Sequence, residues 1–207
     1  MWIRSNDFSN DEPIPGANAF CVPDQDTHAT FGPNQSPHLE WGDAPDGTRS
    51  FALLAIDVDV PTVGDDVNKE GIEVPYDLER TDFTHWAIVD IDPNITGFAR
   101  GEHSSGVTER GKPGASGRPK EGVNDYTNWF AGDADMERTY KGYDGPCPPW
   151  NDARVHRYVF TLYALDVETL ALPDDFTASD VETAAEGHIL DRASLTGTYT
   201  LNQRLIG

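Results

Sequence analysis

The sequence predicts one mainly β domain with a single well-defined helix. Three apolar runs of strand length lie at 49–56, 85–91 and 157–165, and their β-branched and aromatic residues favour strands. Only the segment 179–189 has apolar residues at helical spacing. A chain of 207 residues favours one domain with a full core over two domains. We therefore expect residues 1–207 to form a single domain.

The first forty residues are rich in turn-forming sequences. Asp11-Glu12-Pro13 and Gly32-Pro33-Asn34 are examples. Pro fixes φ, whereas Gly and Asn tolerate unusual dihedral angles, so such sequences favour turns. We expect short strands joined by loops in this part of the chain.

The three apolar runs are predicted to be core strands of one sheet system. The run 49–56 is bounded by polar turns and is too short for a helix, which favours a buried central strand. The run 85–91 ends at Asp92-Pro93-Asn94, a turn signal. The run 157–165 is rich in β-branched and aromatic residues, which strands favour.

The chain between the second and third strands is predicted to be mostly loop, and a helix is predicted later. Residues 97–125 contain seven glycines and few large apolar side chains, so they can bury little surface. Ser179 and Glu182 have the spacing of a capping box, in which two side chains satisfy free backbone N–H groups at a helix start. We therefore predict that the helix begins at Ser179.

The chain is strongly acidic. Asp and Glu number 36 against 15 Lys and Arg, so the formal net charge is −21. No basic cluster is present that could neutralise phosphates, which argues against nucleic-acid binding. The acids are spread along the chain, and a surface of this kind repels itself until molar salt screens it. We expect a halophilic archaeal source. The alternative is that the acids imitate a nucleic acid and bind a basic partner, in which case they would lie on one face of the protein.

The sequence predicts a cytoplasmic protein without a membrane span. No run of about 18 apolar residues occurs, and the first residues lack the basic stretch and apolar core of a secretory signal. Cys21 and Cys147 are the two cysteines. Without export, the expected state is two reduced thiols. Two cysteines so far apart also provide no structural zinc site.

Ionisable residues near the ends of the predicted strands form the candidate site. Asp57 follows the first strand, His85 opens the second and His156 opens the third. Neighbouring strands would bring the three together, and strand ends with their loops are where pockets form. The group could bind a divalent metal, or the imidazoles could donate hydrogen bonds to a phosphate or carboxylate. The spacing alone leaves both readings open.

The loop 145–149, with the sequence GPCPP, is predicted to be stiff. Each Pro fixes φ and lacks an amide donor, so the loop could form a rigid pocket rim or simply cross between elements. Cys147 has no neighbouring base in sequence, which makes a catalytic thiol a weak hypothesis. The sequence contains no Gly-x-Ser-x-Gly, phosphate-loop or dinucleotide motif.

Seven motifs occur in an order and at intervals typical of one known family. They lie at 34–41 (NQSPHLEW), 44–53 (APDGTRSFAL), 57–61 (DVDVP), 85–86 (HW), 143–149 (YDGPCPP), 156–158 (HRY) and 187–190 (GHIL). With them, the chain resembles the phosphatidylethanolamine-binding protein (PEBP) family, most closely its YbhB/YbcL branch, also described as Raf kinase inhibitor-like. The resemblance covers residues 34–199, most of the chain.

The resemblance implies both a fold and a pocket. The fold would be a PEBP-like β-sandwich of Greek-key type with a few short peripheral helices. The pocket would bind anions such as phosphate, phosphate-bearing headgroups or acetate, without a metal or redox cofactor and without a catalytic residue. Carried over by position, the residues lining it would be Asp57, His85, Pro149, His156 and Tyr158, with Asp59 and Gly145 nearby.

The sequence departs from the family pattern in three places. Val58 and Val60 stand where the usual motif has Pro and Ala, which puts the turn geometry at Asp57 in doubt. Asp152-Ala153-Arg154 stands where a Gly commonly precedes the His-Arg pair. The acidic segment 64–81 is longer than expected between its flanking motifs.

We expect a non-enzymatic binding protein for a small anionic ligand. The alternative is a regulatory inhibitor of a kinase or peptidase that uses the same pocket, and family members act in this way. A hydrolase with an Asp57-oriented imidazole as general base is less favoured, since no nucleophile lies at a recognisable position. The net charge of −21 argues against binding to anionic membranes. Relatives often pair, so a homodimer is a further expectation.

Overall fold

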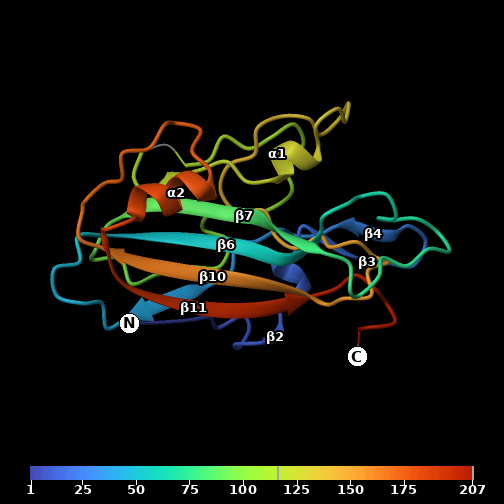
Figure 1. Cartoon of the computed structure of the whole chain (residues 1–207), viewed down its shortest axis with the longest axis horizontal. Helices are drawn as coiled ribbons and strands as arrows, with labels where there is room; N and C mark the ends of the chain where they lie inside the picture. The colour runs from blue at the N-terminus through green and yellow to red at the C-terminus, as the bar shows by residue number, and fades with distance from the viewer. Residues whose placement is uncertain (116, 207) are drawn as a thin grey trace.

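A six-stranded, mostly antiparallel sheet forms the centre of the molecule (Figure 1). The computed structural model describes residues 1–115 and 117–206. In spatial order the strands are β2 (Glu12–Pro13), β11 (Ile189–Tyr199), β10 (His156–Leu165), β6 (Ser50–Pro61), β7 (Arg80–Ile91) and β9 (Lys120–Glu121). The short strand β2 runs parallel to β11, and every other pair in this sheet is antiparallel. The three apolar runs of the sequence are thus adjacent strands in the middle of one sheet.

Alternate residues of the central strands face two different cores. Leu53 and Ala55 belong to the larger core, whereas Leu54 belongs to the smaller one, because successive side chains of a strand point to opposite faces. The smaller core is covered by α2 (Ala178–Ala185), whose Val181 is buried against the sheet. Both faces of the central strands are therefore covered, which explains their continuous hydrophobic sequences.

A second sheet covers the other face. It consists of β1 (Trp2–Arg4), β5 (Leu39–Gly42) and β8 (Gly97–Phe98). Trp41 of β5 packs edge-on against Phe51 of β6, with ring centroids 5.9 Å apart, and joins the two sheets through the larger core. The expected mainly β fold with few helices is confirmed.

The remaining elements are short. They are η1 (Gly16–Asn18), the hairpin of β3 (Cys21–Asp24) with β4 (His28–Phe31), and α1 (Tyr126–Trp129). The loop predicted for 97–125 contains only β8 and β9 as regular structure among its described residues; residue 116 lies outside them. None of the helices among residues 1–115 and 117–206 is long and apolar enough to cross a membrane.

Two predicted element boundaries were wrong. The helix begins after Thr177, whose hydroxyl accepts a bond from the Asp180 backbone N–H while the Asp180 carboxylate accepts from Thr177 N–H. The capping box therefore lies two residues before the predicted one, and Ser179 is inside the helix. His85 does not open its strand, because β7 begins five residues earlier at Arg80.

The expectation of two reduced thiols was also wrong. Cys21 and Cys147 form a disulfide bond across a sequence separation of 126. The backbone brings the two together: Cys21 N–H donates a 3.1 Å hydrogen bond to the carbonyl of Pro146. The bond ties β3 to the loop 145–149.

Candidate functional site

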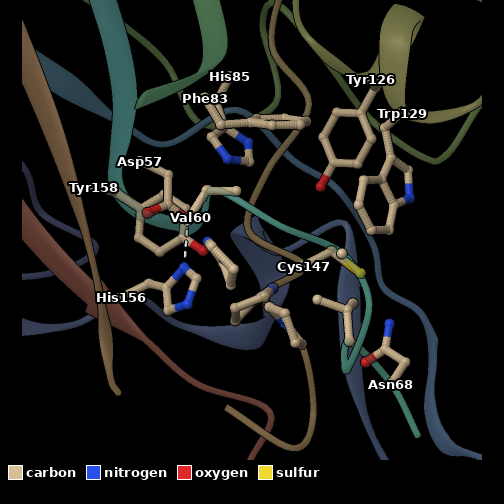
Figure 2. A pocket seen from close by; sticks show the side chains of 15 residues that line it. Asp57, Val60, Asn68, Phe83, His85, Tyr126, Trp129, Cys147, His156 and Tyr158 are labelled. Carbon is tan, nitrogen blue, oxygen red and sulfur yellow. Dashed lines mark hydrogen bonds and ion pairs between the residues drawn. The ribbon is translucent and has the colours of Figure 1, made fainter. Parts of the chain in front are cut away.

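A cavity of about 120 Å³ opens between β6, β7, β10 and the loop 145–149. All five residues expected to line a pocket do so (Figure 2): Asp57, His85, Pro149, His156 and Tyr158. The strands explain why they meet. Asp57 on β6 lies opposite Tyr158 on β10 and opposite Phe83 on β7. Residues far apart in sequence are thus neighbours in the sheet.

Asp59 lies behind the cavity and does not line it. Its carboxylate is buried and accepts bonds from two arginines, from Arg157 Nε at 2.8 Å and from Arg154 Nη1 at 3.1 Å. Burial opposes ionisation, but these bonds outweigh it and lower the pKa of Asp59. Asp59 N–H also donates to Asp57 Oδ1 at 2.9 Å, within the part of β6 where the pairing with β7 is irregular, between Asp57 and Val60.

Gly145 also stands outside the lining and positions the loop. Its N–H donates to Asn34 Oδ1 at 2.8 Å, and its carbonyl accepts the Tyr126 hydroxyl at 2.8 Å. A Cβ at this position would lie 2.0 Å from the carbonyl oxygen of Asn18. Only glycine allows this close approach of two backbones.

His156 is held between two carboxylates. Its Nδ1–H donates to Asp57 Oδ2 at 2.8 Å, and its Nε2–H donates to Asp152 Oδ2 at 3.0 Å. Burial alone would lower the pKa of His156, but the charge of Asp57 and the bonds to both carboxylates raise it to about 9. The ring is therefore an imidazolium at neutral pH, and both of its N–H groups are used within the protein.

Asp152 was not among the predicted site residues. It is fully buried and also accepts a bond from Arg80 Nη2 at 3.0 Å. Arg80, Asp152, His156 and Asp57 thus form a row of alternating charges. The row begins behind the cavity and ends at its lining, which contains His156 and Asp57. The sequence carried one signal, an Asp where a Gly commonly precedes the His-Arg pair, but the contact depends on the fold of the loop.

His85 differs from His156 in its charge. Its Nδ1–H donates to the backbone carbonyl of Asp144 at 2.7 Å. Burial lowers the pKa of His85 despite the negative charges of Asp57, Asp144 and Asp125 around it. The ring is therefore neutral at pH 7, and its Nε2 is left for the cavity. The Asp144 side chain is fixed in turn by amide groups of Asn34 and Asn124, each at 2.8 Å.

The Tyr158 hydroxyl is buried and has no hydrogen-bond partner among the described residues. Burial raises the pKa of Tyr158 well above its usual value, and the charge of the Asp57 carboxylate and its approach to the hydroxyl add to the effect, so the group stays a neutral O–H. The approach does not have the geometry of a hydrogen bond. An unpaired buried hydroxyl is costly in a folded protein. We call Asp57, His85 and Tyr158 the polar end of the pocket.

The rest of the pocket is largely apolar. We call one set of lining residues the apolar wall: Val60, Pro61, Val67, Trp129 and Pro148. Figure 2 shows Trp129 on the opposite side of the pocket from Asp57 and His156. The sequence did not identify Trp129 or the acidic segment 64–81 as pocket residues, because their contacts with the pocket arise only from the fold.

The metal site that the spacing left open finds no support in the geometry. Three of the four imidazole nitrogens of His85 and His156 are bonded to carboxylate or carbonyl oxygens. Across residues 1–115 and 117–206, no group of three or more His, Cys, Asp or Glu side chains is arranged to hold a metal ion.

Comparison with known proteins gives one consistent result. The family model described as "Phosphatidylethanolamine-binding protein" matches residues 4–200, thirty residues further toward the N-terminus than the motifs. A UPF0098 protein of Aquifex aeolicus is 31% identical over 203 residues, which are 96% of this chain and 88% of that protein. The UPF0098 protein YbhB of Escherichia coli is 28% identical and covers 97% of this chain and 100% of its own length.

A solved structure supports the same fold. The crystal structure of YbcL from Escherichia coli, described as a member of the mammalian PEBP family, superposes with a TM-score of 0.68. The alignment covers 96% of this chain and 97% of that chain at 23% sequence identity. At this identity the likeness concerns the fold.

Proposed function

Because the chain belongs to the phosphatidylethanolamine-binding protein family, we propose that it is a non-enzymatic binding protein whose pocket takes a small anionic group. Phosphate, a phosphoester and a carboxylate share the required chemistry. Each offers oxygen acceptors that fit beside donors in a partly enclosed polar site.

The observation that carries this proposal is the unpartnered hydroxyl of Tyr158. A buried O–H without an acceptor favours a ligand that supplies one. An anion accepting from Tyr158 would lie beside His85, which lines the same cavity. His85 Nε2 can take up a proton and become a second donor, so binding would be accompanied by proton uptake.

The negative charge of Asp57 does not exclude an anion. Asp57 is paired with the His156 imidazolium, and Asp152 with Arg80, so each of these two carboxylates has its own cation. Burying an anion next to such neutral pairs costs less than burying it next to a bare carboxylate.

The same pairing argues against general base catalysis by His156. A base must be unprotonated at the working pH, whereas the pKa of His156 is raised to about 9 by Asp57 and Asp152 against the effect of burial.

Four expectations stay predictions: inhibition of a kinase or peptidase through this pocket, a homodimer, a cytoplasmic location and a halophilic archaeal source. The disulfide counts against a cytoplasmic location, because such bonds are rare there.

Replacement of Tyr158 by Phe tests the proposal. Tyr158→Phe should weaken phosphate binding about tenfold, the effect of losing one hydrogen bond of about 1.4 kcal/mol. Titration calorimetry measures the affinity, and thermal unfolding measures the stability. The melting temperature should stay the same or rise, because the lost hydroxyl has no partner in the free protein.

Tyr199→Phe is the matched control. The Tyr199 hydroxyl donates to the carbonyl of Cys21 at 2.9 Å and does not line the cavity. This variant should lose about 1 kcal/mol of stability and keep its phosphate affinity. Equal phosphate affinity for wild type and Tyr158→Phe, or no phosphate binding by the wild type, would disprove the proposal.

A further inference from the structure

The pocket contains more apolar surface than a bare anion needs. The apolar wall contributes five lining residues, and Phe83, Cys147 and Pro149 add further apolar surface. A phosphate at the polar end would leave that wall in contact with water. Burying apolar surface is the main source of affinity in small-molecule sites, so the wall favours a ligand with an apolar part.

Trp129 gives this wall its most prominent surface. It ends α1, and 53% of its surface is exposed, although indole is among the side chains that gain most from burial. Tyr126, one turn earlier on α1, is buried and lines the same cavity. Figure 2 shows the two side chains next to each other at the side away from His156. An aromatic ring of a ligand could pack on the free indole face.

The part of the wall that comes from the acidic segment is held in a fixed position. Gly64, Val67 and Asn68 come from the acidic segment between β6 and β7. Asn68 N–H donates to Asn151 Oδ1 at 2.9 Å, and Trp150 N–H donates to Asn68 Oδ1 at 3.0 Å. The Asn151 amide also donates to the carbonyls of Asp66 and Ile72, at 2.8 and 2.9 Å. The segment therefore belongs to the pocket and is anchored to the loop that follows Pro149.

The size of the cavity limits the ligand. A volume of about 120 Å³ is well below the several hundred Å³ of sites for drug-sized molecules. An acid group and part of one ring fill such a space. The remainder of the ring would lie at the mouth, where Trp129 is exposed.

We propose that the ligand is a small organic acid in which a phosphate or carboxylate is carried on a single aryl-sized apolar group. The acid group lies at the polar end, and the ring packs between Trp129 and Val67. This inference rests on the proposed function, and it adds that the apolar wall, built in part by the segment 64–81, selects among anions.

Calorimetry with inorganic phosphate, phenyl phosphate and phenol tests the inference. Phenyl phosphate should bind the wild-type protein about tenfold more tightly than phosphate, because part of a ring is buried. Trp129→Ala should bring the ratio of the two affinities close to one. Trp2→Ala is the control, because Trp2 is 37% exposed on β1 and does not line the cavity; it should keep the wild-type ratio.

The outcomes separate the two proposals. If phosphate binds and phenyl phosphate binds no more tightly, the apolar wall does not select the ligand and the further inference is wrong, while the proposed function stands. A tenfold ratio that persists in Trp129→Ala also overturns the inference. If neither anion binds, or phenol binds as tightly as phenyl phosphate, the proposed anion site itself is wrong.

Discussion

His156 carries a proton that it cannot share with a ligand, because both of its N–H groups donate to carboxylates. The proton stays in the row of charges behind the pocket and keeps Asp57 paired. His85, with Nδ1 fixed by a carbonyl and a lowered pKa caused by burial, is the imidazole that can respond to a ligand. Two histidines that look equivalent in sequence thus have different roles in the pocket.

Removal of the Asp152 charge should lower the pKa of His156. In Asp152→Asn, one of the two carboxylates that hold the imidazolium is lost, so the pKa should fall from about 9 toward 6.5. NMR titration of the imidazole signals measures it. Asp166→Asn, which removes the partner of the exposed His188, should leave the titration of His156 unchanged. A His156 that titrates near 6.5 in the wild type would contradict the charge pairing.

The same group makes stability depend on pH at alkaline values. A folded-state pKa raised from 6.5 to about 9 contributes stability that is fully present below pH 6.5 and is lost as the pH rises through 9. The melting temperature of the wild type should fall over this interval. The fall should be smaller in Asp152→Asn.

Prediction from sequence reached some residues of the site and missed others. Asp57, His85 and His156 could be found, because they flank apolar runs and match family motifs. Asp152 and Trp129 could not be assigned a role, because the first depends on a loop that turns back onto His156 and the second on a one-turn helix placed at the pocket mouth. Side-chain contacts of this kind follow from tertiary structure and leave no local pattern.

At the scale of elements, strands were easier to predict than their ends. The continuous apolar runs identify β6, β7 and β10, because both sheet faces are covered. The polar first half of β7 was missed, since its residues before His85 are exposed or half-buried. The start of α2 was misplaced because two overlapping segments have capping-box spacing, and the choice depends on which residue leaves the helical conformation.

Substitution at the helix start distinguishes the two capping residues. Thr177→Ala removes the hydroxyl that accepts from Asp180 N–H and should cost about 1 kcal/mol of unfolding free energy. Ser179→Ala lies inside the helix, where alanine is at least as favourable, so its effect should stay within about 0.5 kcal/mol. Urea denaturation measures both variants. A larger loss for Ser179→Ala would contradict the observed cap.

At the scale of the whole molecule, the acidic surface is the dominant feature. The net charge of −21 comes from residues spread over the whole chain, while the charges behind the pocket are paired. Repulsion between surface carboxylates opposes the compact state, and molar salt screens it over about 3 Å.

Salt should stabilise the protein strongly. The melting temperature should rise between about 0.1 and about 2 M potassium chloride. Over this range the screening length falls from about 10 Å to below about 3 Å, which weakens the repulsion between surface carboxylates. Calorimetric scans measure it, and sucrose is a control for general exclusion of a solute from the surface. No rise with salt, or an equal rise with sucrose, would count against a halophilic adaptation.

The bond between Cys21 and Cys147 turns most of the chain into a covalent ring. A force applied to the two chain ends extends only the segments outside the ring. The chain inside the ring spans a sequence separation of 126, ~440 Å at about 3.5 Å per residue, and this length is not extended by the force. One cut of the backbone inside the ring leaves a single molecule that comes apart only after reduction. The rim of the pocket is thus also the point at which this ring is closed.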